Sequence, residues 1–271
     1  MHDISTYIQS ILSREGISSL SESTSRPLRL ADEFHNVDTA LRQNNVNSTI
    51  VVFGSSRVIE AGHLSDNLKC ISPNALEDHL KFYARHARWY QMARDFGRVV
   101  SERGGALASN GTPLHNVITT GGGPGIMEAA NRGASDAGAK SIGFNIILPN
   151  EQPANNYSTP ELTFRFRYFA IRKMHFAMRA KALVIFPGGF GTLDELFEIL
   201  TLKQVRRVSQ LPVVLFDREY WSRVINFQAL YEARMIDHYD TCLFEYVDEV
   251  EEAWNILQRY ELDIRPPLRD S

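Results

Sequence analysis

Short apolar runs alternate along most of this chain with longer stretches of helical period, and this alternation constrains the fold more than any other feature of the sequence. The runs have the length and the β-branched character of strands. They lie at residues 50–53, 116–119, 141–146, 182–186 and 212–216. Strands that alternate with helices pair in parallel, and nearly continuous apolar strands are buried on both faces. The sequence therefore predicts an α/β fold with a doubly wound, Rossmann-like and mostly parallel sheet and helices on both faces.

The stretch between the first two strands predicts a long crossover helix over residues 76–103. Aromatic residues alternate there with arginines, as they also do in nucleic-acid-binding segments, but we favour an amphipathic helix whose arginine face is solvated. Further helices are expected within residues 169–180 and 248–258.

Residues 1–48 are expected to lie outside the core, because a short predicted helix at 4–14 is followed by a serine-rich stretch without a clear period. The β-branched pattern starts at Thr49. We therefore predict a partly helical N-terminal extension over residues 1–48, a Rossmann-like domain over 49–260 and a polar tail over 261–271.

Charge and composition exclude several classes of protein. A formal net charge of -3 gives no overall reason to bind nucleic acid, whose affinity depends on neutralised phosphates. No apolar run approaches the roughly 20 residues of a membrane-spanning helix, so we expect no membrane partner. The N-terminus lacks the cationic segment and apolar core of a secretory signal, and we expect a cytoplasmic protein.

Cys70 and Cys242 lie far apart without metal-ligand spacing, which predicts neither a disulfide framework nor a bound metal.

Three of the predicted strands end directly in glycine-rich turns. The turns lie at residues 54–57 (GSSR), 121–125 (GGGPG) and 187–192 (PGGFGT). Ligands of open α/β sheets bind beyond the carboxyl ends of the strands, where glycines allow close approach and helix N-termini present unpaired N–H groups to an anion. One such turn can simply connect a strand to a helix, but three together predict a site for a phosphate-bearing ligand.

The common nucleotide-binding fingerprints are not matched. The pattern G-x-G-x-x-G fails at Ile126 when it starts from Gly121 and at Asp194 when it starts from Gly189, and GK[ST] does not occur. The chain is therefore predicted to be neither a standard dinucleotide dehydrogenase nor a P-loop NTPase.

Residues 162–193 contain six basic residues and no acidic residue, although the chain is acidic as a whole. The six are Arg165, Arg167, Arg172, Lys173, Arg179 and Lys181. A solvated basic helix face is one explanation. Because the interval leads into the turn at 187–192, it also predicts a local field that attracts anions.

The segment from Thr192 to Glu195 has the form of a helix capping box, in which the glutamate returns a hydrogen bond to the threonine amide. The alternative is that Glu195 faces a ribose beside the phosphate site and stabilises or deprotonates what reacts there. Spacing alone favours neither interpretation.

These motifs resemble the LONELY GUY (LOG) family of nucleoside 5'-monophosphate phosphoribohydrolases, long labelled "lysine decarboxylase-like". The resemblance covers about residues 49–222 and is most specific in the PGGxGTxxE motif at 187–195. Arg172 and Lys173 match the paired basic motif of the family, and residues 121–123 match its GGG turn. The chain has Ile171 where many plant-type members have a glutamate.

The resemblance implies hydrolysis of the N-glycosidic bond of a nucleoside 5'-monophosphate, either a cytokinin nucleotide or an ordinary purine or pyrimidine nucleotide, to free base and ribose 5-phosphate. It implies catalytic roles for Glu195, at the ribose and the attacking water, and for Arg172, at the base. The residues expected to bind the substrate are Gly188, Gly189, Gly191 and Thr192, with Lys173 nearby and with Gly121, Gly122, Gly123, Gly54, Ser55 and Arg57 as further candidates. It also implies a homodimer or a larger homo-oligomer, and no cofactor.

A lysine decarboxylase that uses pyridoxal phosphate is not expected, because none of the six lysines lies in a recognisable context for that cofactor. The alternative from another functional class is a non-catalytic nucleotide-binding or cofactor-carrier protein of the same fold. The intact segment 192–195 together with Arg172 favours the enzyme.

Overall fold

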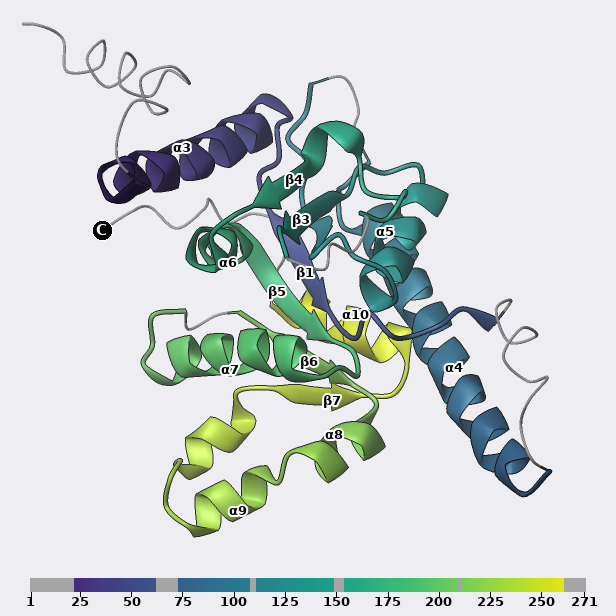
Figure 1. Ribbon diagram of the computed structural model, residues 1–271. Coiled ribbons are helices and arrows are strands. Elements are labelled where there is room, and N and C mark those ends of the chain that lie inside the picture. The colour runs from purple at the N-terminus through teal and green to yellow at the C-terminus, as the bar shows by residue number, and fades with distance from the viewer. Residues whose placement is uncertain (1–21, 62–72, 108–110, 149–153, 209–210, 261–271) are drawn as a thin grey trace, which may run out of the picture.

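The computed structural model describes residues 22–61, 73–107, 111–148, 154–208 and 211–260, and within them seven parallel strands form one sheet in the order β4-β3-β2-β1-β5-β6-β7 (Figure 1). The strands are β1 (Thr49–Phe53), β2 (Val117–Thr120), β3 (Ile142–Ile146), β4 (Thr163–Phe166), β5 (Ala180–Ile185), β6 (Val213–Phe216) and β7 (Glu245–Val247). The predicted α/β class with a parallel sheet is confirmed.

The five predicted runs correspond to β1, β2, β3, β5 and β6, with ends that differ by one or two residues. The sequence pattern did not predict β4 and β7, which form the two edges of the sheet. Both are short and only partly buried, so neither has the continuous apolar run that identifies a central strand.

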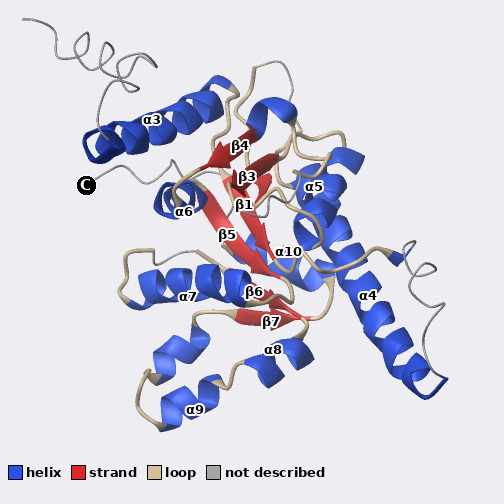
Figure 2. Cartoon of the chain, in the orientation of Figure 1, coloured by secondary structure: helices blue, strands red, loops and turns tan. Residues whose placement is uncertain are grey.

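Helices cover both faces of the sheet (Figure 2). Their bounds are α3 (Glu22–Gln43), α4 (Pro73–Arg103), α5 (Ile126–Asp136), α6 (Phe169–Met178), α7 (Phe190–Gln204), α8 (Arg218–Val224), α9 (Phe227–Glu232) and α10 (Val250–Arg259), with 3-10 turns η3 (Pro160–Leu162) and η4 (His238–Cys242). Ile50 and Val52 of β1 belong to one core with residues of α4, α5 and α10, whereas Val51 and Phe53 belong to a second core with residues of α3, α6 and α7. Alternate residues of the strand thus serve the two faces.

Helix α3 corrects the expectation that the core begins at Thr49. Val37 and Leu41 of this helix are almost completely buried, and Asp38 forms an ion pair with Arg179 at the end of α6. The apolar residues of α3 do recur at helical spacing, but their contacts on α6 lie more than a hundred residues further along the chain and leave no local signal. The expected helix at 4–14 lies outside the described residues.

Helix α4 lies directly against α5 because two glycines remove side chains at the contact. A Cβ on Gly97 would overlap the backbone carbonyl of Ala130, and a Cβ on Gly133 would overlap the backbone carbonyl of Arg94. The C-terminal half of α4 is thereby held in place, while its N-terminal half projects from the body of the domain (Figure 1).

The order of the strands positions a crevice between β1 and β5. The chain runs outward from β1 through β2 and β3 to β4, and then returns to place β5 on the other side of β1. The connections after β1 and β5 therefore lead in opposite directions, which is the arrangement that opens a ligand crevice at the carboxyl ends of parallel strands. Among the described residues, none of the helices combines the length and the apolar composition of a membrane span.

Candidate functional site

A cavity of about 1280 Å³ lies at the carboxyl ends of β1 and β5. Its floor is formed by the turns at residues 54–57 and 187–192, and its walls come from α4, α6, α7 and α8. Two of the three predicted glycine-rich turns therefore converge on one crevice, at the place where the sheet topology predicts a ligand.

Backbone hydrogen bonds of Ser55 hold the first turn in place. The Ser55 N–H donates to the carbonyl of Pro187 at 3.0 Å, and its carbonyl accepts from the N–H of Ile126 at 3.1 Å. A Cβ on Gly54 would lie 2.6 Å from the side chain of Ile126, so only glycine fits there. The predicted residues Gly54, Ser55 and Arg57 all line the cavity.

The second turn opens the N-terminus of α7 toward the cavity. Gly189 is the N-cap of this helix and provides no side chain to bond its first amides. Gly188, Gly189, Gly191 and Thr192 line the cavity, and a Cβ on Gly188 would overlap the side chain of Thr192. Free amides at a helix N-terminus, together with the helix dipole, suit an anion such as phosphate.

The position of the N-cap excludes the capping-box interpretation of Glu195. Since Gly189 is the N-cap, Thr192 is the third residue inside the helix and cannot form the box with Glu195. The carboxyl group of Glu195 instead lies on the cavity wall.

Glu195 is buried and has an unusual proton affinity. Only 6% of the residue is exposed, and burial raises the pKa of its carboxyl group to about 7, although the charges of Lys173 and Arg172 act in the opposite direction. A carboxyl group with this pKa exchanges protons near neutral pH, which suits a catalytic acid or base.

Arg172 extends from α6 to the same cavity. Its Nε–H donates to the carbonyl of Phe144 at 2.7 Å, and its guanidinium lies 5.1 Å from the centre of the Phe176 ring. Burial lowers the pKa of Arg172, and the negative charge of Glu195 opposes that shift. The structure thus brings the two predicted catalytic residues, Glu195 and Arg172, to one cavity.

The third turn lies behind Arg172 rather than on the cavity wall. A Cβ on Gly121 would be 2.6 Å from Nη2 of Arg172, so this glycine makes room for the guanidinium. The carbonyls of Gly122 and Gly123 accept hydrogen bonds from Asn155 at 2.8 and 3.1 Å. Gly121 of the GGG motif makes room for Arg172, while Gly122 and Gly123 bind Asn155, and the sequence pattern predicted neither role.

Lys173 points away from this cavity. Its Nζ forms ion pairs with Asp194 at 2.8 Å and with Glu198 at 2.7 Å. Although burial opposes them, these contacts raise the pKa of Lys173 to about 12. The three side chains line a separate shallow groove of about 560 Å³ over α7, next to Phe190, which is 92% exposed. Lys173 therefore lines this groove rather than the cavity, although its charge still acts on Glu195.

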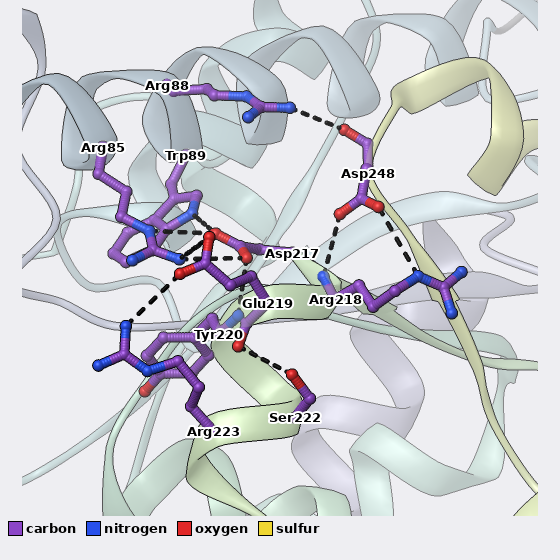
Figure 3. A network of polar contacts seen from close by, with 10 residues as sticks. All are labelled: Arg85, Arg88, Trp89, Asp217, Arg218, Glu219, Tyr220, Ser222, Arg223 and Asp248. Atoms are coloured by element: carbon purple, nitrogen blue, oxygen red, sulfur yellow. Dashed lines mark hydrogen bonds and ion pairs between the residues drawn. The ribbon is translucent and has the colours of Figure 1, made fainter.

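The sequence analysis did not predict the wall of the cavity that α4 and α8 form, because it assigned the arginines of α4 to a solvated face. Trp89 of α4 donates from Nε1 to Oδ2 of Asp217 at 2.7 Å, and the guanidinium of Arg85 contacts the same carboxylate at 3.4 Å (Figure 3). Tyr220 of α8 donates from its hydroxyl to the carbonyl of Gly188 at 2.8 Å. Burial acts to raise the pKa of Asp217, but its hydrogen bonds outweigh that effect and hold the pKa below its usual value. This wall is fixed by the partly buried carboxylate of Asp217, which follows β6 directly.

No group of three histidine, cysteine, aspartate or glutamate side chains in the described part of the chain is placed to hold a metal ion. The polar groups that face the cavity include backbone amides, guanidinium groups and one carboxyl group, and aromatic rings line one end. These suit an anionic substrate and proton transfer.

Comparisons with known proteins identify relatives. A family model described as "Possible lysine decarboxylase" matches residues 127–257, which include Arg172 and Glu195. A probable cytokinin riboside 5'-monophosphate phosphoribohydrolase of Oryza sativa subsp. japonica is 28% identical over 115 residues, or 41% of this chain and 45% of the rice protein. A cytokinin riboside 5'-monophosphate phosphoribohydrolase of Arabidopsis thaliana is 26% identical over 115 residues, or 41% of this chain and 52% of that protein. These findings confirm the resemblance that the motifs indicate.

The chain spans about half the length of these two curated relatives. Among solved structures, the Moco carrier protein from Chlamydomonas reinhardtii shares 19% identity and a TM-score of 0.48, with 79% of this chain and 98% of that chain covered.

Proposed function

We propose that this chain, which is similar to the LONELY GUY (LOG) family, hydrolyses the N-glycosidic bond of a nucleoside 5'-monophosphate to a free base and ribose 5-phosphate. The observation that carries this proposal is the meeting of a buried carboxyl group of pKa about 7, a partly buried guanidinium and an open helix N-terminus in one cavity. The base is a cytokinin-type adenine or an ordinary purine or pyrimidine.

The phosphate is proposed to bind at the N-terminus of α7. Gly188, Gly189, Gly191 and Thr192 line this position, and Ser55 approaches it from the turn after β1. The open amides and the dipole of α7 would balance the negative charge. Anchoring the phosphate there places the sugar next to Glu195, which lies one turn further along the same helix.

Cleavage of the C1'–N bond would proceed through a sugar with oxocarbenium character, which a nearby carboxylate stabilises. Glu195 in its ionised form stabilises this cation and accepts a proton from the attacking water. The water oxygen bonds to C1', the electron pair of the broken bond goes to the base, and the base takes up one proton. Arg172 contacts the departing base and stabilises the charge that develops there.

The first test compares a nucleotide with its nucleoside. We expect AMP to be cleaved at least about 100-fold faster than adenosine, because binding energy from the phosphate orients the sugar for reaction. Released base is quantified by chromatography for a panel of nucleoside monophosphates that includes isopentenyladenosine monophosphate. Equal turnover of AMP and adenosine would contradict the proposal that the N-terminus of α7 binds the 5'-phosphate. Binding of AMP without release of base from any member of the panel would favour a non-catalytic nucleotide-binding protein.

The second test is the dependence on pH. Because Glu195 must be ionised and its pKa is about 7, kcat/KM for AMP should rise about tenfold per pH unit below 7 and level off above it. The phosphate of AMP also ionises near pH 6. A parallel pH series of AMP binding to the Glu195→Gln chain, which lacks this carboxyl group, follows the ionisation of the phosphate without that of Glu195 and serves as the control. An activity that is flat or that falls between pH 6 and pH 8 would contradict the assignment of Glu195.

A further inference from the structure

The cavity extends well beyond the space that the proposed mononucleotide needs. Arg172 is bonded to the carbonyl of Phe144 in β3 and lies over Gly121, which follows β2. At the opposite end, Asp217 follows β6 and fixes Trp89. The two ends of the cavity therefore lie over β2 and β6, which are three strand spacings, or roughly 14 Å, apart in the sheet. The cavity volume of about 1280 Å³ also exceeds the roughly 300–1,000 Å³ typical of small-molecule sites.

The proposed reaction occupies only one of these two ends. Glu195 and Arg172 interact electrostatically, so the sugar and the departing base lie at the end over β2 and β3. The phosphate lies in the middle, at the N-terminus of α7 after β5. The end over β6 is therefore next to the phosphate, on the side away from the sugar.

The end over β6 is lined by a continuous series of aromatic rings. The rings of Phe82 and His86 are 4.0 Å apart between centroids, those of His86 and Trp89 are 5.2 Å apart, and those of Trp89 and Tyr220 are 5.6 Å apart. All four line the cavity, and Phe82 is 50% exposed. Burial lowers the pKa of His86 and so favours the uncharged form of its ring. Such surfaces stack nucleobases of any sequence, because every base has a flat π-face.

The charges along this end suit more than one phosphate. Arg57, Lys81, Arg85 and Arg223 line the cavity there, in addition to Arg172 at the other end, and Glu195 is the one carboxylate among the described lining residues. Asp217 and Glu219 hold Arg85 from behind, at 3.4 Å each (Figure 3). Guanidinium groups held in a fixed orientation are well suited to bind phosphate oxygens.

We propose that the end of the cavity over β6 is a second subsite, which binds an aromatic group attached through the 5'-phosphate. The ligand class is then the dinucleotide, in which a pyrophosphate joins two nucleosides. This inference rests on the proposed function for the placement of the sugar and the first phosphate. It adds that the exposed ring of Phe82, backed by His86 and the buried Trp89, binds the second base, and that the arginines at this end bind the second phosphate.

The test measures binding to the full-length Glu195→Gln chain, so that no turnover is required. Calorimetric titrations use AMP, ADP and diadenosine 5',5'-pyrophosphate. Affinity should rise in that order, and the dinucleotide should bind at least about tenfold more tightly than AMP, which is the scale of one base stacked on aromatic side chains. Phe82→Ala in the same background should lower the affinity for the dinucleotide to near that for ADP and change the affinity for AMP by less than twofold.

Phe169→Ala is the matched control, because Phe169 is 51% exposed, close to the 50% of Phe82, and lies outside the cavity lining. It should leave all three affinities unchanged. Equal affinities for AMP and the dinucleotide would overturn the proposal. So would a Phe82→Ala variant that loses affinity for AMP as strongly as for the dinucleotide, since the base of the mononucleotide would then lie over β6. If the wild-type chain releases no base from AMP but binding of the dinucleotide still depends on Phe82, the proposed hydrolysis fails and the subsite stands.

Discussion

Replacement of Glu195 by glutamine is expected to lower the turnover of a nucleoside monophosphate by about 10²–10⁴-fold, the usual range for a group that transfers protons in the transition state. Glutamine has nearly the same size and keeps the hydrogen-bonding capacity, but it can neither stabilise a cation by charge nor accept a proton from water. The measurement is kcat and KM for AMP at pH 8, where Glu195 is mainly ionised.

The same substitution should stabilise the fold. The pKa of Glu195 is raised from its ordinary value of 4.5 to about 7, so the folded chain disfavours the ionised carboxylate. The resulting loss in the free energy of unfolding is absent well below pH 4.5 and grows between pH 4.5 and 7. Above pH 7 it is fully present and reaches about 3 kcal/mol. The Glu195→Gln chain should therefore melt several degrees above the wild type at pH 8, and the difference should shrink toward pH 5.

Glu198→Gln provides the matched control for both measurements. Glu198 lies three residues further along α7 and forms an ion pair with Lys173 in the shallow groove, outside the cavity. Its substitution should change turnover by less than about threefold and should not raise the melting temperature, because a surface ion pair contributes little and here is lost. A Glu195→Gln chain with wild-type turnover would show that the carboxylate is dispensable. A lower melting temperature at pH 8 would show that the charge of Glu195 stabilises the fold.

Substitution of Gly121 by alanine should lower turnover, because the added Cβ would displace the guanidinium of Arg172. The new Cβ would lie 2.6 Å from Nη2 of Arg172 and 2.8 Å from Sδ of Met127. Both are distal atoms of flexible side chains, and Gly121 is not among the glycines with positive φ, so the backbone tolerates alanine while the guanidinium moves. We expect Arg172→Ala to lower turnover by about 100-fold, as for other donors that stabilise developing charge, and Gly121→Ala to lower it in the same direction.

A double-mutant cycle identifies the route of this effect. If Gly121 acts only by making room for Arg172, the double variant Gly121→Ala/Arg172→Ala should be no slower than Arg172→Ala alone. The melting temperatures of all three variants report whether the turn itself still folds. Additive losses in turnover would show that Gly121 contributes independently of Arg172, and wild-type turnover of Gly121→Ala would show that the guanidinium does not need its observed position.

The features predicted correctly from the sequence are those set within single elements. The runs at 50–53 and 182–186 indicate buried strands because a strand covered on both faces must be apolar throughout. The turns at 54–57 and 187–192 were expected to meet at one crevice because both follow the carboxyl ends of parallel strands, and both line the cavity. The edge strands β4 and β7 escaped prediction because each has one neighbour and is partly exposed.

The site itself was predicted only in part. Glu195 and Arg172 were proposed as site residues through the family resemblance, and the structure brings both to one cavity, while the spacing of Thr192 and Glu195 was equally compatible with a capping box. The choice depends on the residue at which α7 begins, and Gly189 begins it because the loop packs against its neighbours: Ser55 binds Pro187, and Tyr220 binds the carbonyl of Gly188.

The sequence by itself determined the parallel α/β class, the central strands, two turns that face the cavity and charges near them. Each of these follows from backbone sterics or from burial along one continuous segment. Only the tertiary structure decided that Lys173 faces α7 while its neighbour Arg172 faces the cavity, and that Trp89 meets Asp217 across 128 positions of sequence. Such pairings depend on the order of the strands and on the direction in which each helix crosses them, and no local pattern of residues records either.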